Sequence, residues 1–132
     1  MPFESIYIQS SNPLATLDIK RRIQASSKTA VLESRKDAQA ILVIQNARLK
    51  KRILSVSGTG RVREFQLRYS ISFRVNDQKG REIVPDTKIE VNRVLPYSDS
   101  AILSAAAEEN MLLKDMKKDA ILKLMDRLGK VK

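Results

Sequence analysis

The feature that most constrains the fold is a stretch in which apolar and polar residues alternate strictly. Apolar side chains fill every second position, as Phe65, Leu67, Tyr69, Ile71, Phe73 and Val75, and polar ones lie between them, as Gln66, Arg68, Ser70, Ser72 and Arg74. Because successive side chains of a strand point to opposite faces, this stretch predicts a strand with one buried and one wet face. Such a strand requires a sheet that is covered on one side only.

The flanking sequence predicts partner strands on both sides. Asp77-Gln78-Lys79-Gly80 is a hairpin turn with Gly available for a positive φ. A strand follows it, with one face made of Ile83, Pro85, Thr87, Ile89 and Val91. Pro85 has no N–H to donate, which places it at a sheet edge, a strand start or a bulge.

Residues 38–56 predict one long strand or a bent pair. The apolar run 40–44 is typical of a central strand, and the looser pattern beyond it indicates a bulge near Lys50-Lys51 or, equally well, a bend. Ser57-Gly58-Thr59-Gly60 then makes a turn.

Two helices complete the predicted order of strand, helix, three strands, helix. After a first strand at residues 3–9, Asn12 caps a helix that begins at Pro13 and ends near Ser26, with Lys20, Arg21 and Arg22 toward its C-terminal end. Ser98 or Asp99 caps a final helix that stops at Gly129 and carries an apolar stripe of Ile102, Leu103, Ala106, Leu113, Met116, Ala120, Ile121, Leu124 and Leu128. We therefore expect a single α+β domain over residues 1–132, with its helices on one face of the sheet.

The residue types that are missing narrow the function. The chain of 132 residues has no His and no Cys, which excludes His- or Cys-based metal sites, Cys nucleophiles and a Ser-His-Asp triad. Glu108 and Glu109 are adjacent in a helix and so diverge by about 100°. The loop before Arg61 lacks the nucleotide-binding pattern and leads into a strand. We expect no enzymatic activity, no cofactor and no metal, and no apolar run is long enough for a transmembrane helix.

Positive charge is concentrated in one predicted hairpin. The net charge is +10, and between Asp37 and Glu64 all charged residues are basic: Arg48, Lys50, Lys51, Arg52, Arg61 and Arg63. Such a hairpin suits an anionic partner, namely nucleic acid, phospholipid headgroups or phosphorylated saccharides. A solvated basic face that discourages edge pairing explains it equally well. Arg93 falls on the opposite side, with Ile89 and Val91.

The polar face of the predicted sheet bears on the choice of partner. Sheets that bind RNA display aromatic residues as stacking platforms, whereas Phe65, Tyr69 and Phe73 here share the covered face. The exposed face carries Gln, Arg and Ser instead, which weakens a nucleic-acid function without excluding backbone contacts. That face either meets water or lies in a polar cavity, such as the lumen of an outer-membrane barrel.

Several short motifs, in this order, resemble the family of lipopolysaccharide (LPS)-assembly lipoproteins called LptE or rare lipoprotein B. They are Pro2-Phe3-Glu4-Ser5-Ile6-Tyr7-Ile8, residues 61–75, a turn ending at Gly80, Ile89-Glu90-Val91-Asn92-Arg93, Pro96-Tyr97, Ile102-Leu103, Glu108-Glu109, Leu112, Met116, Asp119-Ala120-Ile121-Leu122 and Arg127-Leu128. The resemblance implies two helices on one face of a four-stranded, mostly antiparallel sheet. It also implies a non-enzymatic lipoprotein that plugs and helps to assemble the LptD barrel and binds LPS on its way to the outer leaflet.

The resemblance further implies location and binding residues. The protein would face the periplasm from the outer membrane, held by a lipidated Cys that Met1 replaces together with a signal peptide and a few linker residues. The basic residue after the hairpin tip would be Arg61, and a second basic position of the family falls near Ala105, which cannot bind phosphate. Arg93 or a hairpin Lys is the candidate substitute. We predict that LPS phosphates contact Arg61 and Arg63 first, within a supporting field from Arg48, Lys50, Lys51 and Arg52.

Two other functions remain open at this point. A small nucleic-acid-binding domain could use the same basic hairpin, with binding that falls steeply as salt rises. A purely structural subunit could carry these charges for solubility alone. The resemblance favours LPS and LptD as partners, with no nucleic acid.

Overall fold

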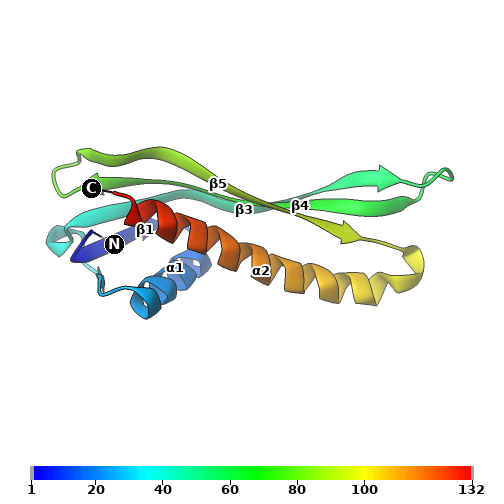
Figure 1. Cartoon of the computed structure of the whole chain (residues 1–132), viewed down its shortest axis with the longest axis horizontal. Coiled ribbons are helices and arrows are strands. Elements are labelled where there is room, and N and C mark those ends of the chain that lie inside the picture. Colours follow the sequence, from blue (N-terminus) through cyan, green and yellow to red (C-terminus); the bar gives the residue numbers. More distant parts are fainter. Residues whose placement is uncertain (1, 132) are drawn as a thin grey trace.

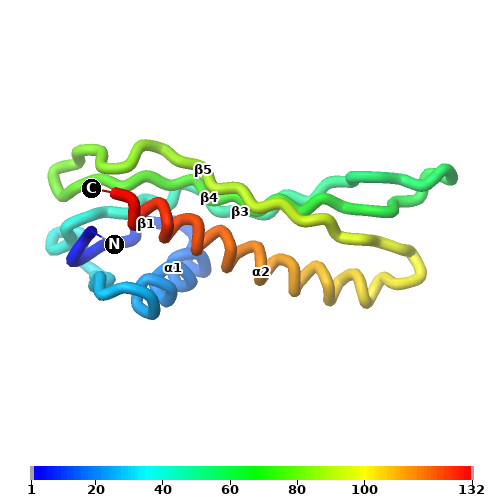
Figure 2. Tube along the Cα trace, in the orientation of Figure 1, coloured from blue at the N-terminus to red at the C-terminus, as the bar shows by residue number. Residues whose placement is uncertain are grey.

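Three long consecutive strands form the spine of an elongated molecule (Figure 1). The computed structural model describes residues 2–131. The long strands are β3 (Ala40–Val56), β4 (Val62–Asp77) and β5 (Glu82–Pro96), and they pair antiparallel as two hairpins. The turn at residues 77–80 has Gly80 at φ 82°, which confirms the predicted hairpin turn with a positive φ. Figure 2 shows how far the β3–β4 hairpin extends beyond the short elements near the N-terminus.

The sheet has five strands in the order β2-β1-β3-β4-β5. The short strands are β1 (Ser5–Ser10) and β2 (Ala30–Leu32), and β1 pairs in parallel with both β2 and β3. The expectation of four mostly antiparallel strands is therefore wrong, since the sheet is mixed. The sequence pattern missed β2 because three residues at an edge are too few for a period to be visible.

Both helices lie on the same side of this sheet, as predicted (Figure 1). Helix α1 (Pro13–Ser26) contacts β1, and helix α2 (Ile102–Gly129) contacts β4 and β5. The Asn12 side chain accepts a hydrogen bond from the Ala15 N–H at 3.1 Å, so the predicted N-cap is confirmed. Helix α1 provides the crossover that a parallel pair such as β1–β2 requires. Short 3-10 turns, η1 (Arg35–Asp37) and η2 (Asp99–Ala101), complete the order.

Register shifts lie at places that the sequence did not reveal. In β3 they fall between Ile44 and Asn46 and around Ser55, not at Lys50-Lys51 as predicted. In β5 two shifts place Val84 opposite Val75, so the predicted alternation does not continue through Ile83 and Pro85. Pro85 lies within one of these irregularities on an edge strand, where its missing N–H costs no ladder hydrogen bond.

Most of the hydrophobic core lies at the end of the sheet that α1 covers together with the last turns of α2, and Leu67 and Leu95 extend it toward the hairpin tip. Its largest fully buried side chains are Ile6, Ile19, Ile23, Leu42, Leu67, Ile71, Phe73, Leu95, Met116, Leu124 and Leu128. No β3 residue after Ile44 is buried. The predicted apolar stripe of α2 therefore divides: the part from Met116 onward packs on the sheet, whereas Ile102, Leu103 and Ala106 are exposed. Within residues 2–131, no helix combines the length and low polarity needed to cross a membrane.

Ion pairs hold α2 to the sheet where apolar packing thins. Arg93 of β5 contacts Asp115 at 3.5 Å and Asp119 at 3.2 Å, so its predicted place on the covered side is confirmed. Closer to the hairpin tip, Lys51 Nζ lies 2.6 Å from Glu109 Oε1 and 4.4 Å from the centre of the Phe65 ring. The Phe65 ring in turn meets Tyr97 edge-on at 5.2 Å. These contacts form a small second cluster under the distal sheet.

Replacing Phe73 by Ala tests where the stability resides. Because this ring is fully buried, the change should lower the free energy of unfolding by about 3–5 kcal/mol, measured by urea denaturation. Leu103→Ala is the control, since this side chain is 87% exposed and should change stability by less than about 0.5 kcal/mol. Equal losses in the two variants would contradict the position assigned to the core.

A double-mutant cycle tests the distal ion pair. Lys51→Met and Glu109→Gln should show a coupling free energy of about 0.2–1 kcal/mol in chemical denaturation, because both side chains are partly exposed. Added salt should weaken this coupling. Lys50→Met is the matched control: Lys50 lies on the opposite face and should not couple to Glu109. A coupling for Lys50 as large as for Lys51 would contradict this arrangement of faces.

Candidate functional site

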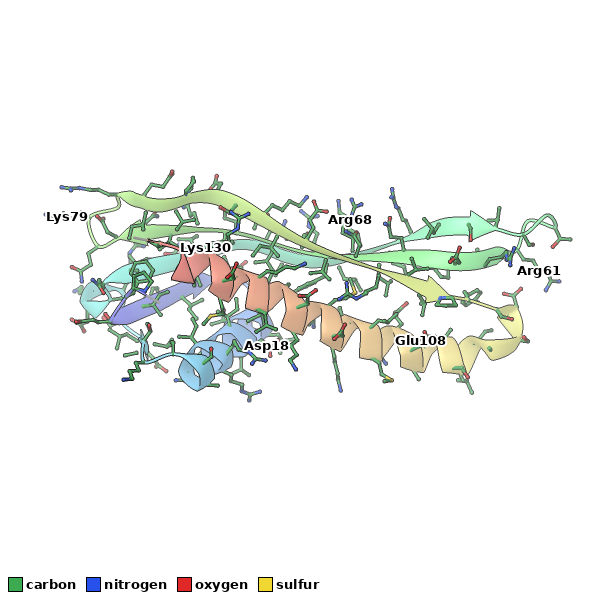
Figure 3. The ribbon with its side chains drawn as sticks, viewed as in Figure 1. Asp18, Arg61, Arg68, Lys79, Glu108 and Lys130 are labelled. Carbon is green, nitrogen blue, oxygen red and sulfur yellow. The ribbon has the colours of Figure 1, made fainter. Side chains whose placement is uncertain are left out.

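The β3–β4 hairpin ends in a tight turn that carries Arg61. In this turn the Gly60 N–H donates to the Ser57 carbonyl at 2.9 Å, and Gly60 has φ 80°, a conformation that suits Gly. Figure 3 shows Arg61 at one extremity of the molecule and Lys79, in the other hairpin turn, at the opposite extremity. The sequence-predicted turn is thus confirmed, and it presents Arg61 far from the core.

Three predicted binding residues of β3 share the uncovered face of the sheet. Arg48, Lys50 and Arg52 lie opposite Ser70, Arg68 and Gln66 of β4. Arg48 Nε donates to Asn46 Oδ1 at 3.2 Å, and Arg52 Nε donates to Gln66 Oε1 at 2.6 Å. Within residues 2–131, none of the three forms an ion pair. Their positive charge is therefore directed outward.

A shallow hollow lies on this uncovered face. It measures about 250 Å³ and is lined by Asn46, Arg48, Lys50, Arg68, Ser70, Ser72 and Lys88. Two of its cations are already engaged: Arg68 and Lys88 both pair with Glu90, at 3.2 and 3.5 Å. The hollow is consequently most positive on its β3 side, at Arg48 and Lys50.

Lys51 is separated from the other predicted binding residues. It lies opposite Leu67, a residue of the covered face, and its ammonium group is held by Glu109 and the Phe65 ring. The sequence could have predicted this position of Lys51, because alternate residues of a strand share a face and Lys51 therefore lies on the same side of β3 as Leu49 and Ile53. Lys51 therefore binds the sheet to α2 in the described structure.

Arg61 and Arg63 differ in their surroundings. Arg61 is 73% exposed and pairs with Asp99 at 3.2 Å, which links the hairpin tip to η2. Arg63 is the unmatched residue at the last register shift of the hairpin, and its carbonyl accepts the Tyr97 N–H at 2.9 Å. Its exposed side chain has no ion pair among residues 2–131. The hairpin tip thus offers one paired and one unpaired guanidinium group.

Exposed aliphatic side chains, which were not predicted from the sequence, accompany these cations. They are Ile53, Leu54 and Val56, each between 44 and 57% exposed. The available signal was the irregular alternation of apolar and basic residues along 47–56, which indicates a strand without a fully covered face. The hairpin therefore presents both positive charge and exposed apolar surface.

Neither Ala105, where the family's second basic position falls, nor its candidate substitute Arg93 adds a second cation to the tip. Ala105 is buried, at 8% exposure, and Arg93 is turned toward α2 by Asp115 and Asp119. Tyr69 belongs to the hydrophobic core: burial raises the pKa of its phenol, and the nearby charge of Asp18 raises that pKa further. That phenol stays neutral as part of the core. Among residues 2–131, no group of acidic residues is arranged to hold a metal ion.

Comparison with solved structures places this fold among bacterial lipoproteins. The solution structure of an uncharacterized lipoprotein B from Nitrosomonas europaea matches with a TM-score of 0.86 and 38% identity, over 94% of this chain and 81% of that one. The crystal structure of rare lipoprotein B from Shewanella oneidensis matches with a TM-score of 0.76 and 25% identity, over 95% and 96% of the two chains. A minor lipoprotein from Acinetobacter baumannii shares the fold, with a TM-score of 0.77 and 15% identity over 96% and 91%.

Comparison at the level of sequence families agrees with the structural matches. A search among curated proteins found no significant match. The family model for LptE, described as lipopolysaccharide-assembly, matches residues 3–128, which is nearly the whole chain. The resemblance inferred from the ordered motifs is confirmed by this match. The chain belongs to the LptE family of lipopolysaccharide-assembly proteins.

Proposed function

We propose that this protein binds LPS through its β3–β4 hairpin and acts as the plug and assembly partner of the LptD barrel. Family membership supports a role in LPS assembly. The observation that carries the LPS contact is the composition of the hairpin, where cations and exposed aliphatic side chains occur together. Lipid A has the same two components, phosphate groups and acyl chains, and the two surfaces are complementary.

The chemistry of the hairpin suits phosphate. A guanidinium group can donate two parallel hydrogen bonds to a phosphate, and Lys acts as a point charge. Arg63 has no competing carboxylate in the described structure, and the pair between Arg61 and Asp99 is exposed and therefore weak. Phosphate can thus replace Asp99 as the partner of Arg61 at little cost. Arg48, Lys50 and Arg52 extend the positive field along the uncovered face.

The exposed start of α2 supports a protein partner. Leu103, Ala107 and Met111 follow one another at four-residue spacing, and all three are exposed. Leu103 is 87% and Met111 is 72% exposed, although both lie in regular helix. An apolar helix face in water indicates a surface that another molecule covers. We assign that molecule as the LptD barrel, whose polar lumen would also match the uncovered sheet face of Ser, Gln, Asn and Arg.

The same proposal includes a location on the periplasmic side of the outer membrane, attached through an N-terminal lipid anchor. Two structural relatives are named as lipoprotein B, which supports an anchored form. Nucleic acid is the less favoured ligand: the aromatic side chains Phe65, Tyr69 and Phe73 lie on the covered side and do not offer stacking platforms.

Reversing the charge of the hairpin tip tests LPS binding. Arg61→Asp combined with Arg63→Asp should reduce LPS binding at least about tenfold in a pull-down, because a hydrogen bond to a charged group contributes about 1.5–3 kcal/mol. Lys79→Asp combined with Arg81→Asp makes the same charge change at the opposite extremity and should bind nearly as wild type. Unchanged binding by the tip variant, or stronger retention of duplex DNA than of LPS by wild type, would overturn the assignment.

A charge placed on the exposed face of α2 tests the barrel partner. Leu103→Asp should reduce the amount of LptD barrel that co-purifies with this protein by at least about tenfold, because a buried unpaired carboxylate is costly at an interface. Leu14→Asp is the matched control on α1, where the side chain is 69% exposed. Circular dichroism should show both variants folded. Full recovery of the barrel with Leu103→Asp would refute the proposed contact.

A further inference from the structure

A basic groove lies between the two helices, away from the hairpin. It measures about 540 Å³ and only helix residues line it. Each helix contributes one stripe at spacing i, i+3, i+4 and i+7: Asp18, Arg21, Arg22 and Ala25 from α1, and Lys114, Lys117, Lys118 and Ile121 from α2. Since this spacing places side chains on one helix face, two matched stripes face a common space. Figure 3 shows Asp18 beside the place where the helices meet.

The groove gathers positive charge that the protein itself does not neutralise. Five of its lining residues are cationic and one, Asp18, is acidic. Within residues 2–131 none of the five cations forms an ion pair, although ten such pairs occur elsewhere in that part of the chain. These cations therefore lack the carboxylate partners that nine other basic residues of the described chain have.

Helix α2 separates its charges by face. Asp115 and Asp119 turn toward the sheet, where both contact Arg93, and Lys123 joins them through Asp119. Lys114, Lys117 and Lys118, between and beside these acids in sequence, line the groove instead. The same turns of the helix thus contain aspartates, but these aspartates form ion pairs with Arg93 on the sheet side and not with the lysines of the groove. The groove keeps its excess of positive charge by this arrangement.

Helix energetics do not explain the cluster. The last turn of α1 contains no basic residue, so Arg21 and Arg22 lie too early to interact well with the helix dipole, contrary to the sequence-based expectation. On α2, Lys114 and Lys118 are a like-charged i, i+4 pair, which destabilises a helix. A feature that opposes stability without a structural reason is typical of a binding site.

We propose that this groove is a binding site for a phosphate monoester, distinct from the hairpin. Two guanidinium groups can hold phosphate oxygens bidentately, and three ammonium groups add point charges. Ala25 and the largely buried Ile121 add apolar surface to the lining, which suits hydrocarbon next to the phosphate. The ligand is a soluble phosphate monoester or the phosphate-monoester headgroup of an anionic lipid, and both present the same recognised group.

Nuclear magnetic resonance titration tests the site directly. Glycerol 3-phosphate supplies the soluble phosphate monoester, and glycerol is the neutral control. Phosphatidylcholine vesicles with or without phosphatidic acid supply the lipid form in co-sedimentation. We expect the phosphate-bearing probe of at least one arm to bind, with amide shifts at residues 18–25 and 114–121 for the soluble probe. The arm that binds more tightly identifies the source of the ligand.

Matched variants separate the groove from general charge. Arg21→Gln with Lys114→Gln and Lys118→Gln removes three exposed cations of the groove, and should weaken binding at least about tenfold. Lys28→Gln with Lys79→Gln and Arg81→Gln removes three exposed cations elsewhere and should change binding less than about twofold. Absence of binding in both arms, or equal losses in the two triple variants, would overturn the proposal.

Discussion

The length of the β3–β4–β5 pairing sets the shape on which every other surface depends. A 17-residue strand spans about 55 Å, whereas the 14 residues of α1 span about 21 Å and the 28 residues of α2 about 42 Å. Helix α1 can therefore cover only one end of the sheet, where most of the core forms. Toward the hairpin tip, only α2 covers one face of the sheet and no element within residues 2–131 covers the other. The distal part of the β3–β4 hairpin is therefore exposed.

This mismatch explains why ion pairs replace apolar contacts toward the tip. Near the core, Phe73 and Met116 are fully buried between sheet and helix. Farther out, Arg93 binds two aspartates of α2, and Lys51 binds Glu109 across the same gap. Partly exposed pairs stabilise weakly, so they position α2 without closing the distal surface. The exposed aliphatic residues of the hairpin and of α2 are the consequence, and they provide the surfaces on which binding partners are proposed.

Sequence patterns predicted the features that depend on a few neighbouring residues, such as strand alternation and helix capping. The alternation from Phe65 to Val75 identified β4 and its covered face, and Asn12-Pro13 identified the start of α1. The bulge positions were wrong, because a register shift depends on the partner strand as much as on the strand itself. The parallel pairing of β1 was missed for a similar reason: which strands become neighbours is decided by packing across the whole sheet. The two faces of β3 could have been predicted, since Lys51 is two residues from Leu49 and so lies on the same face of the strand.

Net charge alone did not reveal which basic residues are available for a ligand; the placement of acids does. Arg68, Arg74, Lys88 and Arg93 all have carboxylates within 4 Å, so the positive charge of these four side chains is balanced locally. Two clusters of cations without such partners stand out in the described structure, one in the β3–β4 hairpin and one in the groove between the helices. The hairpin was visible in the sequence because its cations are contiguous along an acid-free segment. The groove was not, because its two stripes are about ninety residues apart and are interleaved with aspartates that only the fold turns away.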